Sequence, residues 1–117
     1  MQFSKLLENK QNEMIETLQK CIQIPSVYAQ DGSIYPYGEK LHDCLEYMLS
    51  VAKEMGFETY NMDEQLGWCE YGQGEEMIAV LGHLDVVPEG DGWTFPPYEG
   101  VISDGKLFCA NARKLSP

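Results

Sequence analysis

A histidine and an aspartate two positions apart, His83 and Asp85, have the types and spacing best suited to chemistry. They follow residues 77–81, an apolar run that predicts a strand covered on both faces. Ligand sites in open α/β sheets lie at the carboxyl ends of strands, so the pair stands at a favourable place. On an extended backbone, residues two apart project to the same side, so Asp85 could orient the imidazole or a bound water. His83 is therefore a candidate metal ligand, and Asp85 is a candidate catalytic residue.

Simpler interpretations of these residues stay open, because a His-x-Asp pair is a weak motif when it stands alone. His83 could be an ordinary polar residue at a strand end. Asp85 could cap the turn into Val86-Val87-Pro88, as aspartate often does. His42, the other histidine, falls on the polar side of a predicted helix and is interpreted as solvated and not as a ligand.

Two helices are predicted in the first half of the chain. Residues 3–22 carry apolar side chains at helical spacing, and the Ile24-Pro25 step ends the pattern because a residue before proline avoids the helical region. Residues 28–38 are rich in turn formers and predict a loop. In residues 39–55 the apolar positions again follow one helix face, and Gly56 stands where a C-terminal cap belongs.

Short strands are predicted after the second helix, at residues 57–60, 67–71 and 77–81. Gly72-Gln73-Gly74 predicts a hairpin turn between the last two. Residues 88–100 are rich in proline and glycine and predict an ordered loop, and residues 101–108 predict a hairpin turning at Asp104-Gly105. The expected fold class is α/β, with two helices packed on a small mixed sheet.

Composition narrows the classes of function. The 117 residues suit one domain, and a hydrophobic content of 44% is typical of a globular chain. With 8 Lys+Arg against 19 Asp+Glu, the net charge of −11 argues against binding to nucleic acid or to an acidic membrane surface. No apolar run could span a membrane, and the N-terminus lacks the apolar region of a signal peptide, so a cytoplasmic location is expected.

A longer string of residues surrounds the histidine and aspartate. Gly82-His83-Leu84-Asp85-Val86-Val87-Pro88 is followed by Gly92-Trp93, by Pro96-Pro97-Tyr98 and by Asp104-Gly105-Lys106-Leu107. With Ile24-Pro25-Ser26-Val27 upstream, this string closely resembles the M20 family of metallopeptidases, in particular its PepV-like dipeptidase branch. The resemblance extends over residues 1–108.

The resemblance implies part of a zinc-peptidase catalytic domain. Family members use two zinc or manganese ions to hydrolyse small peptides or N-acyl amino acids. Their motif histidine ligates one metal, and the aspartate two residues later holds the ring and assists the water. By resemblance these roles fall to His83 and Asp85. Two such metals lower the pKa of a bridging water and stabilise the oxyanion.

The resemblance stops at residues 109–117. Where the family continues Gly-Arg-Gly-x-x-Asp-Asp-Lys-Gly-Pro, this chain reads Cys109-Ala110-Asn111-Ala112-Arg113-Lys114-Leu115-Ser116-Pro117, and Lys114 takes the place of the metal-bridging aspartate. The family's Glu-Glu pair, which holds the general base, lies further downstream. We therefore interpret residues 1–117 as a single incomplete M20-like domain with a divergent tail, expected to be a truncated or frameshifted product and inactive alone.

A second class of function stays open beside the peptidase. The chain could be a non-catalytic fragment or a partner-binding module, so whether it is itself an enzyme is undecided at this point. A partial domain would also leave a sheet edge uncovered, and an uncovered edge predicts self-association.

Overall fold

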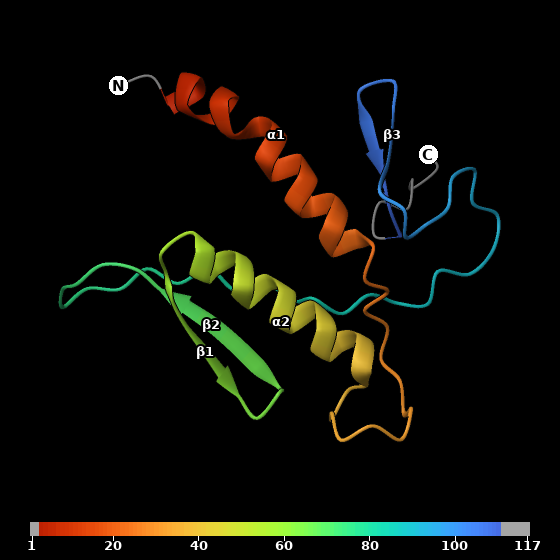
Figure 1. Ribbon diagram of the computed structural model, residues 1–117, viewed down its shortest axis with the longest axis horizontal. Helices are drawn as coiled ribbons and strands as arrows, with labels where there is room; N and C mark the ends of the chain where they lie inside the picture. Colours follow the sequence, from red (N-terminus) through yellow and green to blue (C-terminus); the bar gives the residue numbers. More distant parts are fainter. Residues whose placement is uncertain (1–2, 111–117) are drawn as a thin grey trace. The chain divides into compact units, whose positions relative to one another are not determined.

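A computed structural model of the chain describes residues 3–110. The elements, in chain order, are α1 (Phe3–Ile22), α2 (Glu39–Glu54), β1 (Glu58–Met62), β2 (Leu66–Glu70), β3 (Val101–Ser103) and β4 (Lys106–Phe108) (Figure 1). Two compact units are present: Met1–Ile24 with Glu89–Pro117, and Pro25–Pro88. Neither described helix has the length and apolar character needed to cross a membrane.

Both helices lie where the sequence predicts them, and α2 ends as predicted. Gly56 has a φ of 91°, a left-handed conformation that glycine adopts without steric cost. The amide of Gly56 donates to the Lys53 carbonyl at 3.0 Å, and the amide of Phe57 donates to the Ala52 carbonyl at 3.1 Å. This pair of bonds is a Schellman motif, which satisfies two carbonyls that the helix end would leave free.

The amino end of α2 is capped by a residue distant in sequence. One carboxylate oxygen of Asp31 accepts from the Glu39 amide at 2.8 Å, and the other accepts from the Ser33 amide at 3.0 Å. These bonds stabilise the ionised carboxylate, the Glu39 bond most, and lower the pKa of Asp31 from 3.8 to about 2. Residues 28–38, predicted to be a loop, therefore hold the helix that follows them.

The hairpin β1–β2 packs against α2. The strands are antiparallel, with Tyr60 opposite Trp68, and those two rings stack at a centroid distance of 4.9 Å. Gly67 faces the helix: a Cβ there would come within 2.7 Å of a Leu45 methyl and 3.1 Å of a Leu49 methyl. Only a residue without a side chain lets the strand approach α2 this closely. Cys44, in the same helix, is the most deeply buried hydrophobic residue of the described chain.

Two of the predicted strand features are wrong. Residues 77–81 form no strand, and the Gly72-Gln73-Gly74 hairpin is absent from the described structure. The hairpin instead joins β1 to β2 through Asp63, Glu64 and Gln65, where Asp63 and Glu64 both have positive φ. An apolar segment suited to the middle of a sheet needs a strand on each side, and none of the described residues pairs with 77–81.

The other unit contains α1 and the hairpin β3–β4, which turns at Asp104-Gly105 as predicted. The Gln19 side chain on α1 donates to the Gly100 carbonyl at 2.9 Å. The aromatic residues of the loop before β3 also pack within this unit. The Trp93 indole donates to the Glu89 carbonyl at 2.9 Å, and Phe95 lies 4.6 Å from Phe108, so the loop is ordered as expected.

The fold class is α/β, as predicted, with two helices and two small sheets. The strands form two separate antiparallel pairs, β1–β2 and β3–β4, where a single mixed sheet was expected. A parallel bridge between Val27 and Val86 adds one further pairing. The interpretation of residues 1–117 as one incomplete domain stays a prediction, and Lys114 with most of the divergent tail lies outside the described residues.

The contact of Gly67 with α2 predicts the effect of adding one methyl group. Gly67→Ala should lower the free energy of unfolding of the Pro25–Pro88 unit by about 1–3 kcal/mol, because Leu45 and Leu49 must move. Gly82→Ala is the matched control, since a Cβ there meets nothing within 4 Å. Urea denaturation of both variants measures the difference, and equal stabilities would refute the packing described here.

The capping role of Asp31 predicts a pH dependence. Its folded pKa is depressed, so its contribution to stability is present above pH 3.8 and is lost as the pH falls through about 2. In an NMR titration the Asp31 carboxyl carbon should show a midpoint of about 2. Asp31→Asn should remove this part of the acid sensitivity. A midpoint at the ordinary aspartate value would show that the cap does not form in solution.

Candidate functional site

The segment that carries His83 and Asp85 is fixed by a second stretch of extended chain. The Ser26 hydroxyl donates to the Leu84 carbonyl at 2.7 Å, and the Val86 amide donates to the Ser26 carbonyl at 3.0 Å. Val27 and Val86 form the parallel bridge of this pairing. Ser26 is only 3% exposed, so these bonds are shielded from water. The pairing holds the backbone on both sides of Asp85.

The structure brings His83 and Asp85 together. The Nδ1 atom of His83 lies 3.1 Å from the Asp85 carboxylate and 3.0 Å from the Asp85 carbonyl oxygen. A carbonyl oxygen only accepts hydrogen bonds, so Nδ1 carries the hydrogen. The neutral imidazole then has its lone pair on Nε2. A fixed tautomer of this kind, held by a carboxylate, is the usual arrangement of a histidine that ligates a metal.

Both side chains are open to solvent. His83 has 77% of its side chain exposed and Asp85 has 65%. The residues also line a cavity of about 540 Å³ within the Pro25–Pro88 unit, where Tyr37 and Leu41 form part of an apolar wall. A largely apolar cavity with a few polar groups at its edge is the common form of a small-molecule site.

His83 and Asp85 do not make a complete metal centre in the described chain. Zinc sites in proteins use four protein ligands when structural and three when catalytic. Within residues 3–110, the histidine, cysteine and acidic ligand atoms that lie close together in a set of three or more belong to a different group, which does not include His83. The arrangement at His83 therefore offers one well-prepared ligand position.

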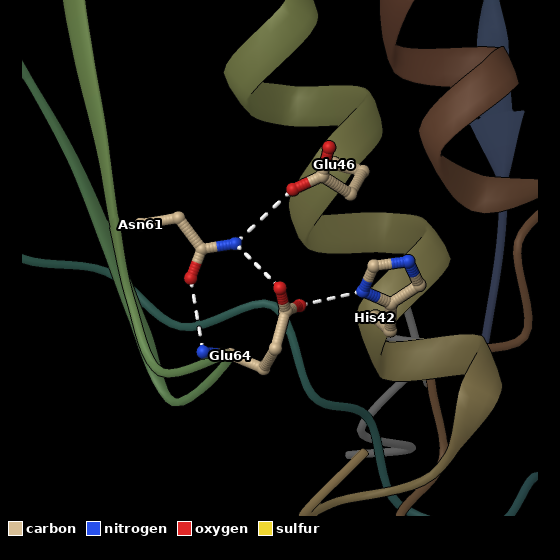
Figure 2. A network of polar contacts seen from close by, with 4 residues as sticks. All are labelled: His42, Glu46, Asn61 and Glu64. Atoms are coloured by element: carbon tan, nitrogen blue, oxygen red, sulfur yellow. Dashed lines mark hydrogen bonds and ion pairs between the residues drawn. The ribbon is translucent and has the colours of Figure 1, made fainter. Parts of the chain in front are cut away.

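The different group contains His42, Glu46 and Glu64, with Asn61 beside them (Figure 2). The interpretation of His42 as a solvated residue is wrong, because only 20% of its side chain is exposed. Its ring stacks on Tyr35 at 3.7 Å, and its Nδ1 lies 2.5 Å from a Glu64 carboxylate oxygen. Sequence reasoning missed this cluster. The spacing of His42 and Glu46, four apart on one helix face, was the available signal.

Comparisons with known proteins place these residues in a wider context. No family model matches the chain. The "Putative dipeptidase YtjP" of Bacillus subtilis (strain 168) is 36% identical over 105 residues, which cover 88% of this chain and 23% of the relative. A "Putative dipeptidase" of Staphylococcus epidermidis is 36% identical over 107 residues, which cover 90% of this chain and 23% of the relative. The "Beta-Ala-Xaa dipeptidase" of Lactobacillus delbrueckii subsp. lactis is 32% identical over 111 residues, which cover 92% of this chain and 24% of the relative.

The match is therefore long for this chain and short for its relatives. Proteins named as dipeptidases resemble it over most of its residues, and the chain spans about a quarter of their length. The region of similarity is large enough to include both the helices and the His83–Asp85 segment.

The pairing of Ser26 predicts how the candidate site responds to loss of one hydroxyl. Ser26→Ala leaves the Leu84 carbonyl without its partner, which should cost about 1–3 kcal/mol of local stability. The Val86 amide should then exchange its hydrogen faster, by about tenfold or more, in NMR exchange measurements. Ser50→Ala is the matched control, because Ser50 makes an exposed hydrogen bond within α2. Equal exchange at Val86 in both variants would contradict the role given to Ser26.

Proposed function

We propose that this chain is the amino-terminal part of the catalytic domain of a metal-dependent dipeptidase of the M20 type. In this proposal His83 ligates a metal ion, and Asp85 is the catalytic residue that positions the His83 ring. The observation that carries the proposal is the contact of His83 Nδ1 with the Asp85 carboxylate at 3.1 Å, in a chain similar to dipeptidases over most of its length.

The residues present fit a zinc or manganese ion at one ligand position. The Asp85 oxygens hold the hydrogen on Nδ1, so Nε2 keeps the lone pair that a metal would bind, and 77% of the His83 side chain is exposed. When bound, such an ion supplies a water of lowered pKa and a positive charge near the scissile carbonyl. Asp85 keeps the ring in one tautomer and one orientation throughout. Ser26, through Leu84 and Val86, holds the backbone of the pair in place.

Small peptides are the proposed substrates. One relative is named for dipeptides that begin with β-alanine, and the others carry the name dipeptidase. The cavity beside His83 is mostly apolar and of a size suited to a short peptide. The cavity therefore supports a small substrate, with the scissile bond placed near His83.

The isolated chain is proposed to be inactive, because the described residues supply a single metal ligand at the site. A second candidate function is favoured by residues 77–81, where Met77, Ile78, Val80 and Leu81 are all at least 86% exposed. Such an exposed apolar segment suits a non-catalytic fragment or a module that binds a partner. Self-association through an uncovered sheet edge, and the cytoplasmic location, stay predictions.

A chimera tests the proposed function. Residues 1–108 of this chain replace the matching segment of the Lactobacillus Beta-Ala-Xaa dipeptidase, and hydrolysis of a β-alanyl dipeptide is measured with zinc or manganese. The chimera should hydrolyse the dipeptide. Asp85→Asn should lower kcat/KM by about 10–100-fold, because the His83 ring loses the carboxylate that orients it. His83→Ala should lower kcat/KM at least as much, because it removes the metal-binding nitrogen itself.

The control variant is Asp91→Asn, which removes the same charge from an exposed loop residue and should leave the rate unchanged. Circular dichroism confirms that each chimera is folded. The isolated chain, assayed with the same metals, should show no hydrolysis. A folded and active chimera in which His83→Ala has no effect would refute the proposed role of this residue.

A further inference from the structure

Three potential metal ligands converge beside the amino-terminal half of α2. His42 and Glu46 stand one turn apart on α2, and Glu64 reaches them from the turn between β1 and β2. One donor atom of each lies within 4.8 Å of the others. We propose that His42, Glu46 and Glu64 bind a divalent transition-metal ion of the zinc class. This site uses none of the residues proposed for catalysis.

The spacing of the donor atoms suits a metal after small side-chain movements. Zinc binds imidazole nitrogen and carboxylate oxygen at about 2.0–2.2 Å, so its ligand atoms lie roughly 3–4 Å from one another. His42 Nδ1 and Glu64 Oε2 are 2.5 Å apart and share the hydrogen that the imidazole donates. A metal ion takes the place of this hydrogen, which leaves to solvent as a proton, and the two atoms move apart to admit it.

The ligands are held by neighbours that would not themselves bind the ion. Tyr35 stacks on the His42 ring with an interplanar angle of 7°. The Asn61 side-chain amide donates to Glu46 at 3.1 Å and to Glu64 at 3.0 Å, and its oxygen accepts from the Glu64 backbone amide (Figure 2). Asn61 thus holds the two carboxylates next to each other.

The charge of the group favours a cation. Two carboxylates that approach one another repel unless a positive charge lies between them. Among the described residues, the ion pair of this group joins His42 to Glu64, and no lysine or arginine pairs with Glu46 or Glu64. The whole chain carries a net charge of −11, which raises the local concentration of cations further.

The donor set indicates the class of ion, and a cavity gives the ion a route to the site. An imidazole nitrogen among the ligands favours zinc and its neighbours in the transition series over magnesium or calcium, which prefer oxygen alone. Glu64 also lines the cavity of about 540 Å³, so an ion can reach it from solvent. His42 is one-fifth exposed, so the metal would be partly shielded from water once it is bound.

Binding of zinc to the whole chain tests this site. Isothermal titration with Zn²⁺, in the presence of a reductant that keeps the four cysteines as thiols, should show a site whose affinity falls about tenfold or more in His42→Gln, Glu46→Gln and Glu64→Gln. Glu46 is exposed, so its substitution removes a ligand without disturbing packing. Glu54→Gln, on the same helix, is the charge-matched control and should bind zinc as the wild type does.

A second readout locates the ion independently of the thiols. Paramagnetic Mn²⁺ should broaden the side-chain amide signals of Asn61 in the wild type and in His83→Ala, and should not do so in Glu64→Gln. Unchanged zinc affinity in the three ligand variants would overturn the proposal. It would also fail if His83→Ala weakened zinc binding as much as His42→Gln does, because the ion would then belong to the other site.

Discussion

The short pairing between residues 25–27 and 84–86 is the contact on which the candidate site depends. Ser26 both donates through its hydroxyl and accepts through its carbonyl, so one buried residue holds the chain before and after Asp85. Without this pairing the His83 segment would be extended chain with no fixed neighbour. The contact joins residues 58 positions apart, so forming it carries a cost in loop-closure entropy that its hydrogen bonds help to offset.

The helices could be predicted from the sequence because their signals are local. Apolar residues at helical spacing fixed the extents of α1 and α2, and Gly56 marked the end of α2 because its left-handed conformation favours glycine. The β3–β4 turn was predicted for the same reason, since Asp104-Gly105 is a strong hairpin signal. The spacing of His83 and Asp85 also allowed a contact between their side chains, and the structure contains that contact. Each of these features is decided within a few residues of chain.

The features that sequence analysis missed depend on contacts between distant residues. The β1–β2 turn places Asp63 and Glu64 at positive φ, with the Asn61 side chain accepting from the Glu64 amide, whereas the glycines at 72 and 74 gave the stronger local signal. Residues 77–81 have the composition of a central strand, but strand formation requires neighbours that the described chain does not place beside them. The prediction that His42 is solvated was wrong because its partners come from other segments: Tyr35 from the loop before α2 in the sequence, and Glu64 from the β1–β2 turn after it.

The exposed apolar segment, residues 77–81, also affects how readily copies of the chain aggregate. Five apolar residues at 77–81, with no proline and no charge, have the composition of a segment that stacks in cross-β assemblies. Glu75 and Glu76 stand immediately before it, as charged gatekeepers do beside such segments. Stacking identical copies in register would bring these acidic pairs together, and their repulsion opposes assembly. Because salt screens that repulsion, the ionic strength of the solution sets how strongly the gatekeepers protect the chain.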